Sequence, residues 1–165
     1  MIKKDDVKGL AKSFVYAYRG ICYCIKNERN MRIHLSAAAL ISYFAYFFQL
    51  NRVEYMILLL CFGFVIAAEA FNTSIEALVN LESPAYHNFA RIAKDVAAAA
   101  VAIAAFAAVL VGIFLFGDPA RLWQTLLRIC SNPLSGLFFA ALLVLAVLFI
   151  FQGPKLFGPR SNRNK

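Results

Sequence analysis

The sequence predicts an all-α integral membrane protein, with an N-terminal amphipathic surface helix and a transmembrane helix bundle of three core spans and an extra C-terminal fourth span. Two observations predict this fold. Of the 165 residues, 62% are hydrophobic and 16% are charged, whereas soluble domains contain about 25% charged residues. The apolar residues also form uncharged stretches of the length that a bilayer requires. This composition excludes a disordered chain and an ordinary nucleic-acid binder, so we expect no nucleic-acid partner.

The first of three expected parts, residues 1–31, is an amphipathic helix on the cytoplasmic membrane surface. Between Val7 and Ile25 the apolar residues recur at steps of three and four, which places them on one helical face. Lysines and Arg19 lie on the opposite face. A basic amphipathic helix of this kind lies flat on a membrane, with its apolar face in the acyl boundary.

The apolar stretches that follow predict four membrane spans, at residues 33–51, 55–81, 96–117 and 129–154, of which only the second contains charged residues, Glu69 and Glu76. Residues 32–117 form the three-span core. Residues 118–165 hold the fourth span, whose apolar centre is 134–151, and a basic cytoplasmic tail. The third span is rich in alanine, so we expect it to pack closely inside the bundle or at an oligomer interface.

The distribution of positive charge predicts the orientation. The net charge is +8, with 17 Lys and Arg against 9 Asp and Glu. Eight of these Lys and Arg residues precede the first span, and others lie in the loop at residues 80–95 and in the tail. Loops with such an excess face the cytoplasm, so we expect both termini there. Arg121 and Arg128, in the connection before the fourth span, weaken this bias.

Glu69, Asn72 and Glu76 are the most informative residues, because they lie at i, i+3 and i+7 within a span and share one helical face. A carboxylate at the centre of a membrane helix costs about 3 kcal/mol. Two on one face therefore indicate a partner: a metal, another cation or a water-filled site. The alternative is a structural polar seam between helices.

The predicted topology brings further polar residues to the same membrane face, namely Glu28, Lys94 and Asp95. Carboxylates with open coordination positions suit Mg²⁺, and a neighbouring lysine suits phosphate, which together favour phosphoryl transfer. No P-loop or dinucleotide-binding glycine motif is present. Two other functions stay open: a small ion or proton transporter that uses Glu69 and Glu76, and a scaffold without catalysis.

The motif residues resemble those of the prokaryotic diacylglycerol kinase family of small integral-membrane lipid kinases. The resemblance covers about residues 10–117 and rests on AEAFNTSIEALV at 68–79, the Tyr-His pair at 86–87 and Ala-Lys-Asp at 93–95. Tyr-Arg-Gly at 18–20 and Lys-Asn-Glu-Arg-Asn at 26–30 are closer to the Gram-positive branch, which acts on undecaprenol.

The resemblance implies specific roles for these positions. Glu69 is implied as the catalytic base that takes the proton of the lipid hydroxyl, and Glu28 and Glu76 as ligands of the Mg²⁺ that accompanies ATP. It also implies a homotrimer with shared active sites. The remaining implied site residues surround the phosphates and the nucleotide: Asn72, Lys94, Asp95, Tyr16, Tyr86 and His87.

The expected reaction is therefore ATP-dependent, Mg²⁺-dependent phosphorylation of a lipid alcohol in the bacterial cell membrane. Undecaprenol, which yields undecaprenyl phosphate, is the first candidate substrate, and diacylglycerol, which yields phosphatidic acid, is the alternative. The chain departs from the family pattern in two respects. Asn80 stands where many members carry Asp, and the fourth span is extra.

Overall fold

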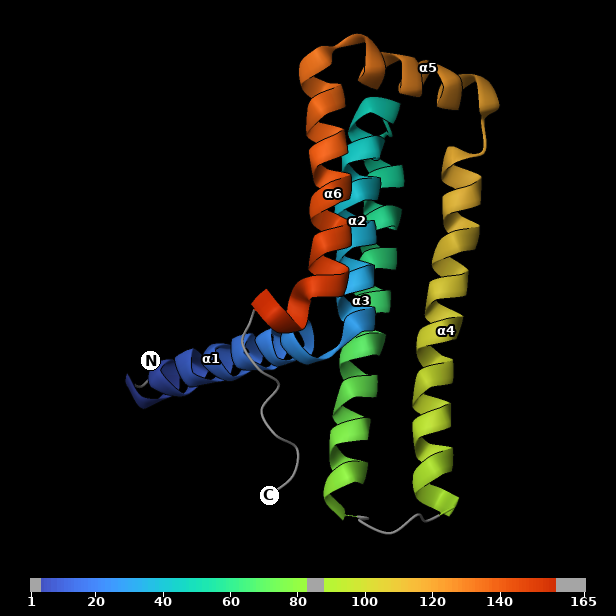
Figure 1. Ribbon diagram of the computed structural model, residues 1–165. Helices are drawn as coiled ribbons and strands as arrows, with labels where there is room; N and C mark the ends of the chain where they lie inside the picture. The colour runs from blue at the N-terminus through green and yellow to red at the C-terminus, as the bar shows by residue number, and fades with distance from the viewer. Residues whose placement is uncertain (1–3, 83–87, 157–165) are drawn as a thin grey trace.

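The computed structural model describes residues 4–82 and 88–156, and these fold into six α-helices. Helix α1 is Lys4–Asn27, α2 is Arg29–Phe48, and α3 is Arg52–Glu82. Helix α4 is Asn88–Phe116, α5 is Pro119–Ser131, and α6 is Pro133–Leu156. Figure 1 shows α2, α3, α4 and α6 running along one common direction, with α1 leaving the bundle sideways and α5 crossing one end.

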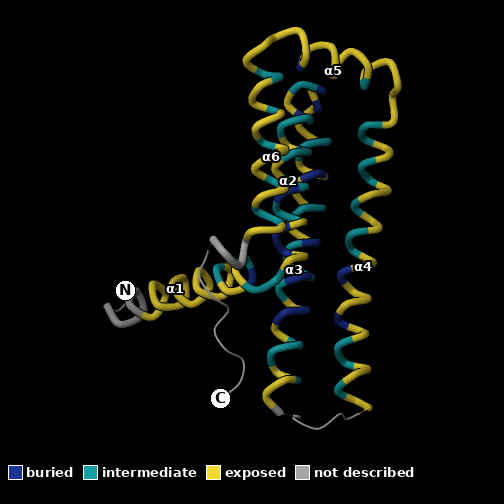
Figure 2. The backbone as a smooth tube through the Cα atoms, viewed as in Figure 1, coloured by how far each residue is buried: buried dark blue, intermediate teal, exposed yellow. Residues whose placement is uncertain are grey.

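Four of the described helices are long and apolar enough to cross a membrane: Arg29–Phe48, Arg52–Leu81, Asn88–Phe116 and Pro133–Gln152. Their outer faces carry large apolar side chains such as Phe106 and Phe114, which are 64% and 87% exposed. Figure 2 shows that most of α4 and α6 is exposed in the same way. Such a surface is stable only in an apolar solvent, so the predicted membrane bundle is confirmed.

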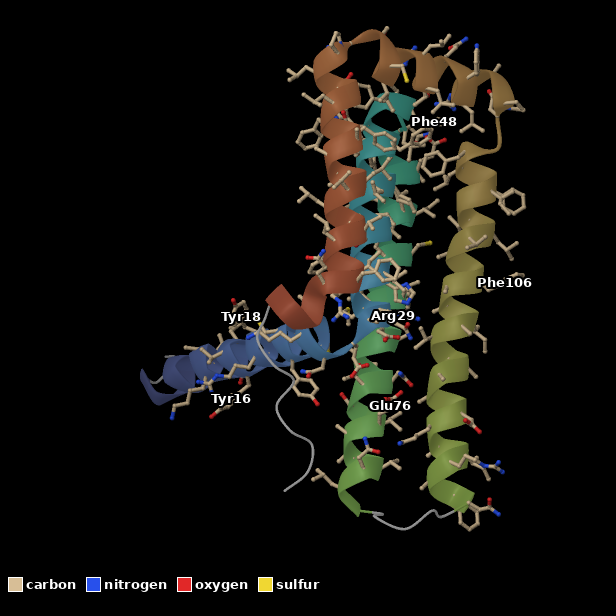
Figure 3. The ribbon with its side chains drawn as sticks, viewed as in Figure 1. Tyr16, Tyr18, Arg29, Phe48, Glu76 and Phe106 are labelled. Atoms are coloured by element: carbon tan, nitrogen blue, oxygen red, sulfur yellow. The ribbon has the colours of Figure 1, made fainter. Side chains whose placement is uncertain are left out.

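Helices α3 and α4 are longer than a bilayer core requires. The 31 residues of α3 extend over about 46 Å at the usual helical rise, whereas the hydrocarbon core is about 30 Å thick. Figure 1 shows both helices continuing past the corner between α1 and α2. The end of α3 that carries Glu76 therefore lies beyond this corner (Figure 3).

The structure changes two of the expected boundaries. Residues 88–95, expected in a loop, form the first two turns of α4. The helix begins before its apolar stretch, because charged residues such as Lys94 and Asp95 are compatible with helical structure. The segment 118–128, expected as a connection, is mostly helical and belongs to α5. Residues 129–131, expected in the fourth span, also belong to α5, so α6 begins only at Pro133. Asp118 caps α5 by accepting the backbone amides of Ala120 and Arg121 at 2.9 and 3.2 Å, and Pro119 occupies its first turn.

Helix α5 carries Arg121 and Arg128, the two arginines that do not fit the cytoplasmic excess of positive charge, and both contact α2. The Arg121 guanidinium donates to the carbonyl of Phe48 at 3.1 Å and lies 4.4 Å from the centre of the Phe48 ring. Arg128 donates to the carbonyl of Phe47 at 3.3 Å. The last carbonyls of a helix have no amide partners of their own. The two arginines thus cap the C-terminal end of α2.

The bundle has an apolar end and a polar end. Next to α5, Phe48 packs against Phe116 with ring centres 5.1 Å apart, in a core cluster with Ala45, Leu50 and Leu58. At the other end, beside α1, lie five of the buried polar side chains of the described residues: Arg32, Ser36, Glu69, Asn72 and Thr73. The remaining buried polar side chain of the described residues, Thr125, belongs to α5. The candidate site lies at this polar end.

Candidate active site

Glu69 is the most enclosed carboxylate of the described residues, with a side chain that is 1% exposed. Its Oε2 atom is buried and has no hydrogen-bond partner among the described residues. The hydroxyl of Thr73, one turn later, donates to the Glu69 backbone carbonyl at 2.9 Å and not to the Glu69 carboxylate. A buried carboxylate oxygen without a donor is costly, so this atom is suited to receive a proton from a bound group.

Asn72 and Glu76 extend the same face of α3, as their spacing predicts. The Asn72 side-chain amide donates to Glu76 Oε1 at 3.2 Å. Asn72 Oδ1, like Glu69 Oε2, is buried without a partner among the described residues. The amide therefore orients the Glu76 carboxylate, and two oxygen acceptors stay open beside it.

Glu28 reaches this face from a different part of the chain. It is the residue between α1 and α2, in an extended conformation with φ −104° and ψ 121°, and its side chain does not cap α2. Its backbone amide donates to the Cys24 carbonyl at 2.8 Å. The carboxylates of Glu28 and Glu76 both lie near enough to Glu69 to act on it electrostatically. The structure thus brings together the three glutamates that the sequence predicts.

Cys24, on the last turns of α1, lies near the same carboxylates, which affect the pKa of its thiol. Burial raises the pKa of the Cys24 thiol, and the carboxylates of Glu28 and Glu69 raise this pKa further, while a hydrogen bond with Thr73 opposes them. Residues of α1, of α3 and of the corner between α1 and α2 therefore contribute to one acidic environment.

Lys94 belongs to α4 and lies at the outer end of this site. Its ammonium group donates to the Asn80 side-chain carbonyl at 2.7 Å. Because the Asn80 side chain is neutral, this contact orients Lys94 without pairing it with a carboxylate. A lysine ammonium without a carboxylate partner is suited to bind phosphate. Asp95, the next residue of α4, is exposed.

Tyr16, the one described residue of the other predicted nucleotide residues, is not brought to the three glutamates. Tyr16 is 63% exposed on α1, and its position is about 18 Å along the helix from Glu28. Figure 3 shows Tyr16 apart from Glu76. Tyr86 and His87 lie outside the described residues.

A magnesium site fits this donor set only if other ligands complete it. Among the described residues, no group of three or more His, Cys, Asp and Glu side chains could hold a metal ion by itself. Mg²⁺ is typically bound by one or two carboxylates together with phosphate oxygens and water. Glu28 and Glu76, with the open oxygens of Glu69 and Asn72 nearby, match that pattern of oxygen ligands.

Arg32 also belongs to this region, although no sequence pattern indicates it. A charged residue at the start of an apolar stretch ordinarily marks the edge of a membrane span. In the structure its side chain is 1% exposed and contacts backbone carbonyls of α1 and α6. No signal in the local sequence indicates these contacts, because the partner in α6 lies far along the chain.

The fold and the site define a class of protein: a small multi-pass helical membrane protein with an acidic site at one end of its bundle. The family model of the prokaryotic diacylglycerol kinases matches residues 15–116. The chain belongs to this family and is a lipid kinase. The match ends with α4, so α5 and α6 lie outside it.

Two relatives support this assignment. An undecaprenol kinase from Bacillus subtilis is 34% identical over 113 residues, which cover 68% of this chain and 92% of the relative. A diacylglycerol kinase from Synechocystis sp. is 39% identical over 111 residues, which cover 67% of this chain and 63% of that relative. No solved structure shows a significant match to this chain.

Proposed function

We propose that this lipid kinase transfers the γ-phosphoryl group of ATP, with Mg²⁺, to the hydroxyl of a membrane lipid alcohol, and that undecaprenol is its first candidate acceptor. The observation that carries this proposal is the Glu69 carboxylate. It is buried, and its Oε2 atom has no partner within the described part of the chain. A carboxylate held away from water in this way is suited to act as a general base toward an alcohol.

In the proposed reaction, the acceptor hydroxyl gives its proton to Glu69 as its oxygen forms a bond to the γ-phosphorus. The bond from that phosphorus to the β–γ bridging oxygen breaks, and ADP leaves with the electron pair. Bound Mg²⁺, held by Glu28 and Glu76, would offset negative charge on the phosphates. Lys94 binds the γ-phosphate oxygens through its ammonium group.

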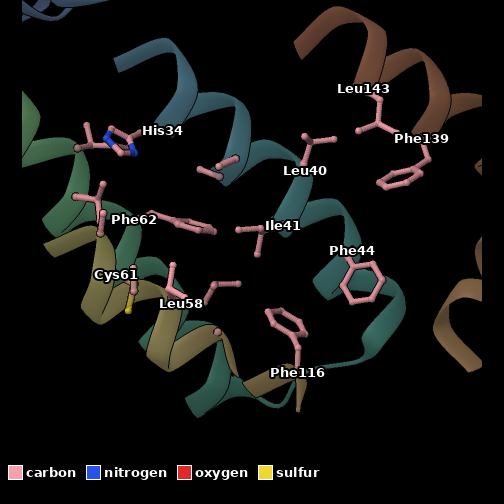
Figure 4. Close-up of a pocket in the computed structure, with 18 residues that line it drawn as sticks. His34, Leu40, Ile41, Phe44, Leu58, Cys61, Phe62, Phe116, Phe139 and Leu143 are labelled. Atoms are coloured by element: carbon pink, nitrogen blue, oxygen red, sulfur yellow. The ribbon is translucent and has the colours of Figure 1, made fainter. Parts of the chain in front are cut away.

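Two apolar cavities support a lipid as the acceptor. One, of about 560 Å³, lies between α1, α2 and α3, and Cys24 and Thr73 are among its lining residues. The other, of about 550 Å³, lies between α2, α3, α4 and α6 (Figure 4). Ile66, one turn before Glu69, lines both. An alcohol with its hydroxyl at Glu69 thus has apolar space for its hydrocarbon chain, of the volume usual for ligand sites.

The fuller match to the undecaprenol kinase supports undecaprenol as the first candidate acceptor, while the diacylglycerol kinase is the more identical of the two over the matched residues, 39% against 34%. The undecaprenol kinase is covered over 92% of its length and the diacylglycerol kinase over 63% of its length. Diacylglycerol is the second candidate, because both alcohols present one hydroxyl above apolar chains.

We also propose that the site and both termini face the cytoplasm of a bacterial cell, where ATP is available. The excess of Lys and Arg before Arg32 supports this orientation, and an even number of spans places both ends on one side. A homotrimer, as the family resemblance implies, would cover part of the exposed apolar surface of α4, including Phe106.

A transporter is less well supported by the described residues. A path through the membrane needs polar groups at several depths. The described buried polar side chains other than Thr125 gather at the α1 end instead.

The test uses the purified full-length chain in mixed micelles with radiolabelled ATP and each lipid alcohol. Glu69→Gln should lower lipid phosphorylation by at least about 100-fold, the usual minimum contribution of a general base. Glu54→Gln is the matched control, because Glu54 lies in the first turn of the same helix and accepts the Asn51 amide at 2.7 Å, as Gln also can. The control should keep wild-type activity. Near-wild-type activity of Glu69→Gln would exclude Glu69 as the base.

A second measurement tests the metal role. Glu76→Gln should raise the Mg²⁺ concentration at half-maximal activity, since a carboxylate ligand is lost. An unchanged magnesium titration would remove Glu76 from the metal site.

A further inference from the structure

Arg32, on the first turn of α2, connects three helices through one buried guanidinium group. Its side chain is 1% exposed. The Nη1 atom donates to the carbonyls of Ile25 and Lys26 in α1 at 2.9 and 3.2 Å. The Nε atom donates to the carbonyl of Ile150 in α6 at 3.4 Å. The charged group thus contacts the ends of two helices from a third.

The two α1 carbonyls need a donor from outside the helix. Helix α1 ends at Asn27, and the last carbonyls of a helix have no amide partners within it. The Cys24 carbonyl is satisfied by the Glu28 amide at 2.8 Å. The next two carbonyls, of Ile25 and Lys26, accept from Arg32 instead. A positive charge at a helix C-terminus also stabilises the helix dipole.

The Ile150 carbonyl needs a donor for a different reason. Within a helix, its partner would be the amide of the residue four positions later. That residue is Pro154, which has no N–H, although α6 continues to Leu156. Arg32 donates to the carbonyl that the proline leaves without a helical partner.

These contacts surround the corner that carries Glu28. Glu28 lies between Lys26, whose carbonyl accepts from Arg32, and Arg32 itself, four residues later. Its carboxylate acts on Glu69, so a shift of the corner moves one carboxylate of the site relative to the others. Helix α6 lies outside the family match and nevertheless bonds to this corner.

We propose that Arg32 is a positioning residue through which the fourth span holds Glu28 in place against the α3 carboxylates. In this role α6 is an anchor of the active site rather than only an additional span. The kinetic part of this inference rests on the proposed function, since it takes Glu28 as a ligand of the metal that accompanies ATP. The structural part does not, because it concerns only the order of the α1–α2 corner.

The experiment compares Arg32→Gln and Arg32→Lys in the full-length chain. Arg32→Gln should raise the Mg²⁺ concentration at half-maximal activity by about tenfold or more, the usual effect of removing a group that orients a metal ligand, while the maximal rate changes less. Arg32→Lys should have an intermediate effect, because lysine keeps the charge but not the planar fork of donors. Hydrogen exchange of the amides at residues 25–32 should accelerate in the same order.

Arg121→Gln is the matched control, because Arg121 also caps a helix C-terminus, at the opposite end of the bundle. It should lower the melting temperature without changing the Mg²⁺ requirement or the exchange at residues 25–32. Pro154→Ala tests the part played by α6, since alanine supplies the amide that the Ile150 carbonyl lacks. It should raise the Mg²⁺ requirement by about two- to threefold, and its effect should disappear in the Arg32→Gln background, because contacting groups are not additive.

Unchanged exchange and an unchanged Mg²⁺ requirement in Arg32→Gln would overturn the positioning role. Additive effects of Pro154→Ala and Arg32→Gln would overturn the part assigned to α6. Faster exchange at residues 25–32 in Arg32→Gln would support the structural part of the inference even if the wild-type chain phosphorylated no lipid. The absence of lipid phosphorylation by the wild-type chain would contradict the proposed function, so failure of the inference and failure of the proposed function are distinguishable.

Discussion

The bond between Asn72 and Glu76 allows a sharp test of how the site is held, through the substitution Asn72→Asp. The side chains are nearly equal in shape, but Asp replaces the donor Nδ2, which lies 3.2 Å from Glu76 Oε1, with an oxygen. A hydrogen bond to a charged group contributes about 1.5–3 kcal/mol. Because each 1.4 kcal/mol corresponds to about tenfold, its loss should lower kcat/KM for Mg-ATP by about 10- to 150-fold, before any repulsion between the two carboxylates is added.

The assay is the initial rate of lipid phosphorylation against Mg-ATP concentration at a saturating concentration of the lipid alcohol. Asn51→Asp is the matched control, because Asn51 caps the other end of α3 by accepting the amides of Val53 and Glu54 at 2.9 and 3.0 Å. Asp caps helices as well as Asn does, so the control should be neutral. A change in kcat/KM of less than about threefold in a folded Asn72→Asp variant would refute the reasoning.

Two other predictions concern stability and reactivity. Arg121→Gln removes the bond to the Phe48 carbonyl and the contact of the guanidinium with the Phe48 ring, so it should destabilise the bundle by about 1–3 kcal/mol; thermal unfolding in detergent checks this, and an unchanged melting temperature contradicts it. Cys24 should react with a maleimide more slowly than the exposed Cys130, because Cys24 is buried and its raised pKa lowers the thiolate fraction near pH 7. Its labelling rate should rise with pH, and equal rates for the two thiols would contradict this environment.

The bundle could be predicted because the bilayer imposes a length on each apolar stretch. Helix α5 could not be recognised in the same way. It is short and amphipathic, and Arg121 and Arg128 interrupt its apolar residues, so hydropathy treats it as a connection. The start of α4 cannot be placed from hydropathy for a related reason, since Lys94 and Asp95 bound the apolar stretch but the helix begins before them, at Asn88.

The candidate site also contains residues that the sequence predicts and residues that it does not. Helical periodicity is enough to place Glu69, Asn72 and Glu76 on one face, and the Asn72–Glu76 bond agrees with it. Periodicity cannot place Glu28 beside them, because that contact depends on the turn between α1 and α2; only the predicted topology and the family resemblance indicated it. Arg32 could not be found from sequence patterns, since its contact with Ile150 joins residues 118 positions apart.

The most direct test of the central claim is the transfer of radiolabelled phosphate from ATP to lipid by the purified wild-type chain, with undecaprenol and diacylglycerol supplied side by side. The acidic site of Glu28, Glu69 and Glu76 predicts Mg²⁺-dependent formation of a labelled lipid phosphate, and the proposed acceptor predicts that undecaprenol is preferred. Labelling of diacylglycerol in preference to undecaprenol would contradict the proposed acceptor. Labelling of neither lipid, with Mg²⁺ and ATP present, would contradict the assignment of this site to phosphoryl transfer.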